Sequence, residues 1–226
     1  MSLSGNLRSP SLVAGNFTGR SSCLAPLLAS RVACAIAATL VGCSPAGRPR
    51  PVAVPSVDPA AAAELAIKEY DRDGDGRLNA NELKACPGIL AAKGRYDTDK
   101  DQTISNEEIA AMLKSMFDSG VGLIGVHCTV SRGSQPLSGA TVRFVPEAFL
   151  GDAIKPAVGT TDASGTAAVA IPDDQLPADQ HGLQSVQPGV YRIEVEHASI
   201  RRPAPLRGCE INPAVRGSTD VTIRLK

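Results

Sequence analysis

The chain has 226 residues, with 23 Lys and Arg against 23 Asp and Glu, so its formal net charge is zero. A neutral chain lacks the basic excess that a nucleic-acid-binding face needs, which argues against nucleic acid as a partner. Aromatic residues make up only 3% of the chain and Trp is absent, so any core must be built from Val, Ile, Leu and Ala. The length allows one or two small domains.

The first predicted element is a targeting segment. Three arginines precede an apolar run at residues 32–42, which is too short to span a membrane and is typical of a signal peptide. The run ends in LVGC, residues 40–43, which resembles the lipobox of bacterial lipoproteins. This resemblance implies that residues 1–42 are a signal peptide and that Cys43 becomes the lipidated first residue. The alternative is an ordinary cleaved signal and a secreted protein.

Residues 43–58 are rich in proline and form a predicted linker. Such a segment is extended, so it would hold the folded part away from a membrane. The expected location is therefore outside the cytoplasm, with a lipid anchor in the membrane at the periplasm or the cell surface.

Two acidic stretches, at residues 71–82 and 97–108, share one pattern, with aspartates at positions one, three and five and a glutamate at position twelve. Calcium explains this spacing, because it takes six to eight oxygen ligands at ~2.4 Å. Position seven offers its backbone carbonyl, position nine often acts through water, and the final glutamate contributes two oxygens. The candidate Ca²⁺ ligands are Asp71, Asp73, Asp75, Arg77, Asn79 and Glu82 in the first loop, and Asp97, Asp99, Asp101, Thr103, Ser105 and Glu108 in the second.

The residues around these ligands resemble those of the EF-hand family. Gly76 stands at position six, where the chain turns sharply. Leu78 and Ile104 stand at position eight, where the family joins its two loops by a short β-bridge. Tyr70 and Tyr96 directly precede the loops, where the family places a core aromatic residue. The resemblance implies a small all-α EF-hand pair at residues 59–120.

Helix signals surround the loops. Asp58 followed by proline predicts a helix start, and Gly120 predicts the end of the last helix. Asn79 with Glu82, and Ser105 with Glu108, have the spacing of a capping box. Because so few residues separate the two loops, the helices between them must be short.

The expected role of the calcium is structural. Calcium is often abundant outside the cytoplasm, where modules that bind at only ~10⁻⁴ to 10⁻³ M stay loaded. Gln102 occupies position six of the second loop, where a non-glycine residue at positive φ costs about 1 kcal/mol, so the second loop is expected to bind more weakly. The alternative is a calcium-responsive adaptor that exposes Met112 and Met116 in a groove.

After Gly120 the hydrophobic pattern changes from helical to alternating, which predicts short strands with one apolar face. The stretches TVSRGSQPLSGATVRFVP, GTTDASGTAAVAI and PGVYRIEV look like those of the carboxypeptidase-regulatory-like, or transthyretin-like, domain. That resemblance implies an antiparallel, prealbumin-like β-sandwich at residues 121–226, which usually serves as an accessory module. The fold class expected for the chain is therefore α+β with two domains. The inward-facing side chains are expected to be Ile124, Val126, Cys128, Val130, Ala140, Val142, Phe144, Tyr191, Ile193, Val195, Val221, Ile223 and Leu225.

No pattern predicts an enzyme. The chain contains none of the GxSxG, HExxH, P-loop or GxGxxG motifs, and its three histidines are scattered. Beyond Cys43, the predicted mature chain has three cysteines, of which Cys128 and Cys209 could pair; the sequence leaves this open.

The sequence thus predicts a calcium-binding, lipid-anchored envelope protein with a structural or adhesive role. Envelope proteins or polysaccharides are the candidate partners. Besides the adaptor, a second alternative is a carbohydrate- or peptide-binding accessory module that uses the long polar loop at residues 173–188.

Overall fold

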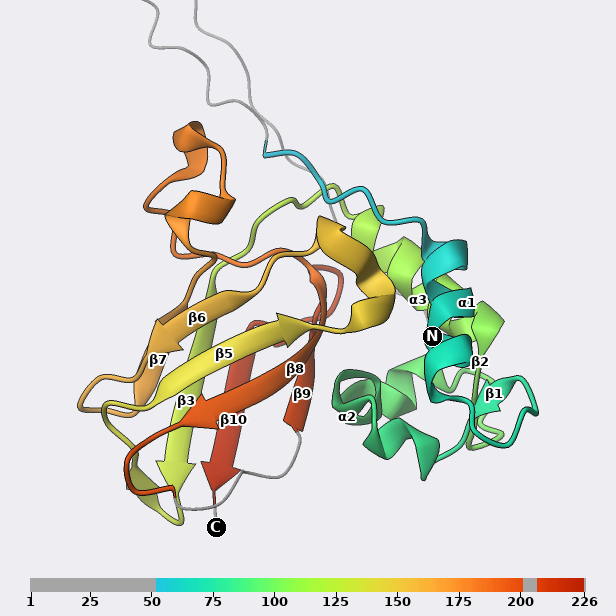
Figure 1. The fold of residues 1–226 in the computed structure, drawn as a ribbon, viewed down its shortest axis with the longest axis horizontal. Coiled ribbons are helices and arrows are strands. Elements are labelled where there is room, and N and C mark those ends of the chain that lie inside the picture. Colours follow the sequence, from blue (N-terminus) through green and yellow to red (C-terminus); the bar gives the residue numbers. More distant parts are fainter. Residues whose placement is uncertain (1–51, 201–206, 226) are drawn as a thin grey trace, which may run out of the picture. The chain divides into compact units, whose positions relative to one another are not determined.

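The computed structural model describes residues 52–200 and 207–225. The predicted signal peptide, Cys43 and the first part of the linker lie outside these ranges. All described elements belong to one compact unit, Gly47–Lys226. This unit contains helices and sheets, so the expected α+β class is confirmed (Figure 1).

The helical segment contains α1 (Pro59–Tyr70), the 3₁₀ turn η1 (Glu82–Lys84), α2 (Pro87–Tyr96) and α3 (Asn106–Phe117). The carboxylate of Asp58 accepts hydrogen bonds from two amides of the first turn of α1, as its position predicts. Ser105 and Glu108 form the predicted capping box of α3. Within the described ranges, no helix has the length and apolar character that crossing a membrane requires.

The β segment contains two four-stranded sheets and a few 3₁₀ turns. The first sheet consists of β3 (Val126–Arg132), β4 (Gln135–Pro136), β7 (Thr166–Val169) and β10 (Asp220–Leu225); the second has the order β6 (Ala157–Thr160), β5 (Thr141–Pro146), β8 (Gly189–Glu196), β9 (Arg207–Ile211). The 3₁₀ turns are η2 (Ala148–Ala153), η3 (Asp173–Gln175) and η4 (Ala178–Gln180).

One strand pair corrects the expectation of a wholly antiparallel structure. Strand β10 runs parallel to β3, whereas the other pairs in both sheets are antiparallel. The chain leaves the second sheet after β9 and crosses to the first, where it reaches the edge of β3 in the same direction. Alternating side chains look the same in parallel and antiparallel strands, so the sequence pattern could not show this.

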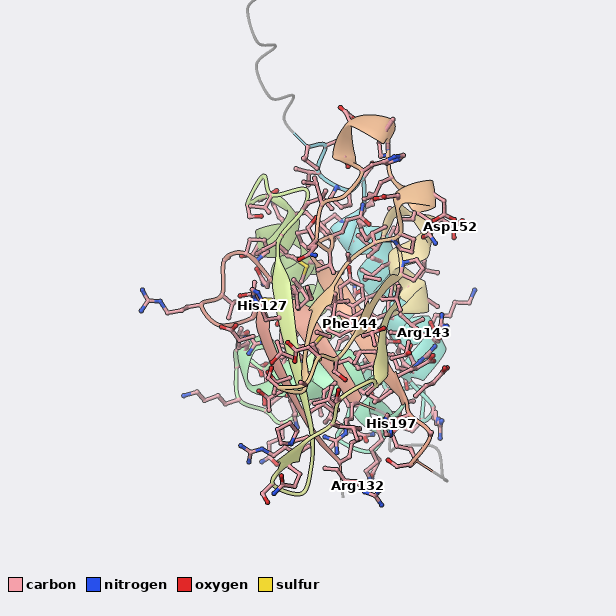
Figure 2. All side chains as sticks on the ribbon, turned by 90° about the vertical axis from the view of Figure 1, so that its left-hand side faces the viewer. His127, Arg132, Arg143, Phe144, Asp152 and His197 are labelled. Atoms are coloured by element: carbon pink, nitrogen blue, oxygen red, sulfur yellow. The ribbon has the colours of Figure 1, made fainter. Side chains whose placement is uncertain are left out.

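The apolar faces of the two sheets meet in a common core. Of the side chains expected to face inward, Ile124 and Val221 are half-buried and the others are buried. Phe144 is fully buried between the sheets, and its neighbour Arg143 is exposed (Figure 2). This alternation confirms the predicted inner faces of these strands.

The helices and the sheets share one hydrophobic core. Helix α2 packs against β8 and β9, and α1 packs against η2. Gly88 in α2 and Gly208 in β9 allow the closest approach, because a Cβ atom on Gly208 would lie 2.2 Å from the backbone nitrogen of Gly88. The division at residue 120 into two domains stays a prediction.

Candidate metal centre

The ends of two helices place the acidic loops side by side. Helix α1 ends at Tyr70 and α2 ends at Tyr96, so each loop begins with the residue after a helix. The two-stranded sheet of β1 (Arg77–Leu78) and β2 (Ile104–Ser105) then joins the loops, with Leu78 opposite Ile104. The side chains of Leu78 and Ile104 are both fully buried. The predicted β-bridge is therefore confirmed.

The first loop gathers three carboxylates. One oxygen each of Asp71, Asp73 and Asp75 lies within 4.8 Å of the others. The carboxylate of Asp71 is held by the amides of Gly74 and Gly76, at 2.7 and 2.9 Å. Because like charges at this separation repel, a cation between them would relieve the repulsion.

Glu82 lies outside that group of three. Its side chain is buried, and it accepts hydrogen bonds from the amides of Arg72 and Asn79, both at 2.8 Å. Burial by itself would raise the pKa of Glu82, but the loop amides outweigh it and the pKa is lowered. The Asn79 side chain accepts from the Glu82 amide in return and donates to Asp73. Glu82 therefore stays ionised beside the three aspartates.

The second loop brings together Asp97, Asp99 and Glu108, whose oxygens also lie within 4.8 Å of one another. Glu108 is buried and accepts hydrogen bonds from the amides of Thr98 and Ser105, at 2.7 and 2.9 Å. Burial would raise its pKa, but these donors lower it. Among the described residues, Asp97 Oδ1 is buried with no hydrogen-bond partner, so the loop contains an unsatisfied acceptor.

An ion pair that the sequence analysis missed joins the two loops. The Arg77 guanidinium contacts the carboxylate of Asp101 and donates a hydrogen bond of 3.1 Å to Thr103 Oγ. Asp101 also accepts from the amide and hydroxyl of Thr103, which together with Arg77 lower its pKa. Arg77 was predicted to act only through its carbonyl. Its side chain competes for a predicted ligand, but exposed pairs of this kind contribute only about 0–1 kcal/mol.

The second loop also carries the predicted backbone strain. Gln102 has a φ of 72°, close to the 80° of Gly76 at the matching position of the first loop. Lys100 likewise has a φ of 62°, where the first loop has Gly74 at 78°. The two loops therefore share a positive φ at positions four and six, although only the first has glycine at these positions.

Other predicted features lie away from the loops. Cys128 and Cys209 are buried free thiols, as is Cys86. Met116 is fully buried, and Met112 is half-buried against the core. His127 on β3 and His197 after β8 lie apart from each other (Figure 2).

Two buried glutamates of the β segment also escaped the sequence analysis. Glu147 accepts a hydrogen bond from the hydroxyl of Tyr70, and Glu210 accepts from the guanidinium of Arg95. Tyr70 stands directly before the first acidic loop, and Arg95 stands two residues before the second. Each glutamate sits within or beside an otherwise ordinary strand pattern, which gives no signal of burial.

The oxygen-rich loops fit a hard divalent cation, because carboxylate and carbonyl ligands suit Ca²⁺ and Mg²⁺ better than zinc. The structure groups six of the predicted carboxylate ligands and leaves Glu82 and Asp101 outside the two groups. The chain matches no protein-family model and no curated protein.

Proposed function

We propose that the protein binds Ca²⁺ at two EF-hand loops, residues 71–82 and 97–108. The observation that carries this proposal is the group of Asp97, Asp99 and Glu108, in which a buried Asp97 oxygen lacks a partner among the described residues. An unsatisfied buried acceptor costs about 1–3 kcal/mol, and a cation would satisfy it. The matching group in the first loop supports a second site.

Calcium fits this ligand set better than magnesium does. Ca²⁺ accepts irregular geometry with six to eight oxygens, whereas Mg²⁺ demands a near-ideal octahedron and keeps several waters. Each loop offers aspartate side chains and, at position twelve, a glutamate that can bind the ion through both of its carboxylate oxygens. When bound, the cation would neutralise the clustered carboxylates.

Calorimetric titration with calcium tests the ligand assignment in variants of the two glutamates at position twelve. Glu82→Gln and Glu108→Gln should each abolish binding at one loop, because an amide cannot clamp the ion with two charged oxygens. Glu107→Gln, one residue from Glu108 and exposed, and Glu64→Gln on α1 are matched controls that should bind as the unchanged protein does. Unchanged titration heats in Glu82→Gln and Glu108→Gln would overturn the assignment.

We further propose that the protein is an exported lipoprotein of the cell envelope, anchored through Cys43, in which the calcium has a structural or adhesive role. The lipobox-like LVGC supports the anchor. Full burial of Met116 favours a structural role over an adaptor that exposes a methionine groove. Labelled fatty acid should be incorporated into the expressed chain, and Cys43→Ser should abolish the incorporation; equal labelling of both would refute the anchor.

The β segment is proposed to be a transthyretin-like accessory module that contacts envelope proteins or polysaccharide. Two observations support this assignment: the sequence stretches at residues 129–146, 159–171 and 188–195, and the two facing sheets. A pull-down from envelope extracts, with and without a calcium chelator, tests whether a partner is held.

A further inference from the structure

Each acidic loop is preceded by a side chain that reaches a buried glutamate of the β segment. Tyr70, the residue directly before Asp71, donates its hydroxyl to Glu147 at 3.0 Å. Arg95, two residues before Asp97, donates Nη2 and Nε to Glu210 at 2.5 and 3.2 Å. Both calcium loops are thus tied to the β segment at the point where their helices end.

The contact at Glu147 is buried. Glu147 is 1% exposed and stands between β5 and η2, where its amide donates to the carbonyl of Val190 in β8. The Tyr70 ring packs edge-on against Phe149 of η2, with centroids 6.4 Å apart. A buried carboxylate that loses its donor is costly, so the position of the Tyr70 hydroxyl is strongly restrained.

The contact at Glu210 continues into a buried polar network. The Glu210 side chain is fully buried, and its second oxygen accepts from the side-chain amide of Asn212 at 2.8 Å. Asn212 is fully buried, approaches Met112 Sδ of α3 and bonds with Ser218. The network therefore joins α2 and α3 to the β9–β10 turn at residues 212–219.

We infer that the β segment positions both calcium loops, the first through Tyr70–Glu147 and the second through Arg95–Glu210, so that calcium binding and the order of the β segment are coupled. This inference rests on the proposed calcium binding. A cation that fixes a loop also fixes the end of the helix before it, and the buried bonds pass that restraint to η2 and to the β9–β10 turn. Because coupling between two sites is reciprocal, a bond that calcium binding reinforces also strengthens calcium binding, so we expect removal of either bond to weaken it.

The first test is hydrogen exchange on the full chain with and without Ca²⁺. We expect added calcium to slow amide exchange at residues 147–153 and 207–219, as well as in the loops themselves. Strand β6 at Ala157–Thr160 is the internal reference, because it belongs to the β segment but contains neither Glu147 nor Glu210. Calcium uptake with no slowing at 147–153 and 207–219 would overturn the inference and leave the proposed calcium binding intact.

The second test measures calcium affinity one loop at a time. In the Glu108→Gln background, which isolates the first loop, Tyr70→Phe should weaken binding by about fivefold or more, the lower end of typical coupling between sites. In the Glu82→Gln background, Glu210→Gln should do the same for the second loop. The matched controls are Tyr191→Phe, which removes a hydroxyl that donates to Gln187, and Glu196→Gln on the surface.

The results of these tests distinguish the coupling from the calcium binding itself. Equal affinity in the variants and in the controls would overturn the coupling, whereas complete absence of calcium uptake by the unchanged protein would overturn the proposed function and the coupling together. Circular dichroism at the titration temperature checks that each variant is folded, and the hydrogen-exchange test needs no variant.

Discussion

At the scale of single residues, the two loops differ most at position six. Gln102 holds a positive φ that glycine occupies in the first loop. A side chain at such a φ costs about 1 kcal/mol, because the Cβ atom crowds the backbone. The sequence alone predicted this strain, since the ligand spacing fixes where the chain must turn.

Replacing Gln102 by Gly should relieve the strain. We expect Gln102→Gly to stabilise the calcium-loaded protein by about 1 kcal/mol and to tighten binding at the second loop. Gln102→Ala keeps a Cβ atom and is the control. Calcium titration and thermal melting of the three proteins check this, and equal gains from Gly and Ala would show that φ is not the cause.

Glu147 makes stability depend on pH. Burial raises its pKa above the ordinary value of 4.5, although the Tyr70 hydrogen bond and nearby Arg192 oppose the rise. A carboxyl group whose pKa is higher in the folded protein than in the unfolded chain takes up its proton more readily when folded. Its ionisation therefore costs stability as the pH rises above 4.5, and the cost disappears as the pH falls below it.

The variant Glu147→Gln removes this ionisation while keeping an oxygen that can accept from Tyr70. We expect the stability of Glu147→Gln relative to the unchanged protein to be greater at pH 8 than at pH 4.5. Denaturant unfolding at both pH values measures the difference, with exposed Glu196→Gln as the control. A difference that stays constant across this range would contradict the raised pKa.

The site residues that the sequence predicts lie close together along the chain, whereas those that it does not predict act through distant contacts. The predicted ligands from Asp71 to Glu82 lie within one loop, so their spacing carries the information. Glu147 and Glu210 gain their importance from contacts with Tyr70 and Arg95, which are far away in the sequence. Local spacing cannot show such pairs.

At the scale of elements, the packing of α2 on β9 depends on two glycines. A Cβ atom on Gly208 would lie 2.2 Å from the backbone nitrogen of Gly88, and backbone atoms cannot move aside cheaply. This close approach brings Arg95 of α2 within reach of Glu210 in β9.

Alanine at Gly208 should separate α2 from β9. We expect Gly208→Ala to lower the free energy of unfolding by about 1–3 kcal/mol through overpacking. Gly94→Ala in the same helix is the matched control: its Cβ atom would meet nothing within 4 Å, so it should stabilise the helix by about 0.5–1 kcal/mol. Chemical denaturation measures both, and a neutral Gly208→Ala would contradict the close contact.

Element boundaries followed from the sequence where local chemistry sets them. Asp58 starts α1, and Ser105 with Glu108 starts α3, because these side chains bond to nearby amides. The parallel pairing of β3 with β10 did not follow, because it depends on how the chain crosses between sheets. Side chains alternate between the two faces of a sheet whichever way the strand runs, so the pattern does not indicate strand direction.

At the scale of the whole described unit, helices and sheets form one hydrophobic core. The change from helical to alternating patterns correctly located the two segments along the sequence. It could not show that they share a core, because an amphipathic face looks the same whether it covers its own segment or another.

A shared core implies shared stability. We expect chelation of calcium to lower the melting temperature of the helices and the sheets together, in one transition seen by both far-ultraviolet circular dichroism and calorimetry. Saturation at 100 times the dissociation constant stabilises a protein by about 2.7 kcal/mol per site. Magnesium at equal concentration is the control. Two separate transitions, with only the first sensitive to calcium, would show that the segments unfold independently.

The central claim is that two loops of this chain each hold a calcium ion. Equilibrium dialysis of the purified protein against labelled calcium tests it most directly, because it counts bound ions without relying on a change in structure. We predict two ions per chain at saturation, and one in either Glu82→Gln or Glu108→Gln. No bound calcium at millimolar concentrations would contradict the claim.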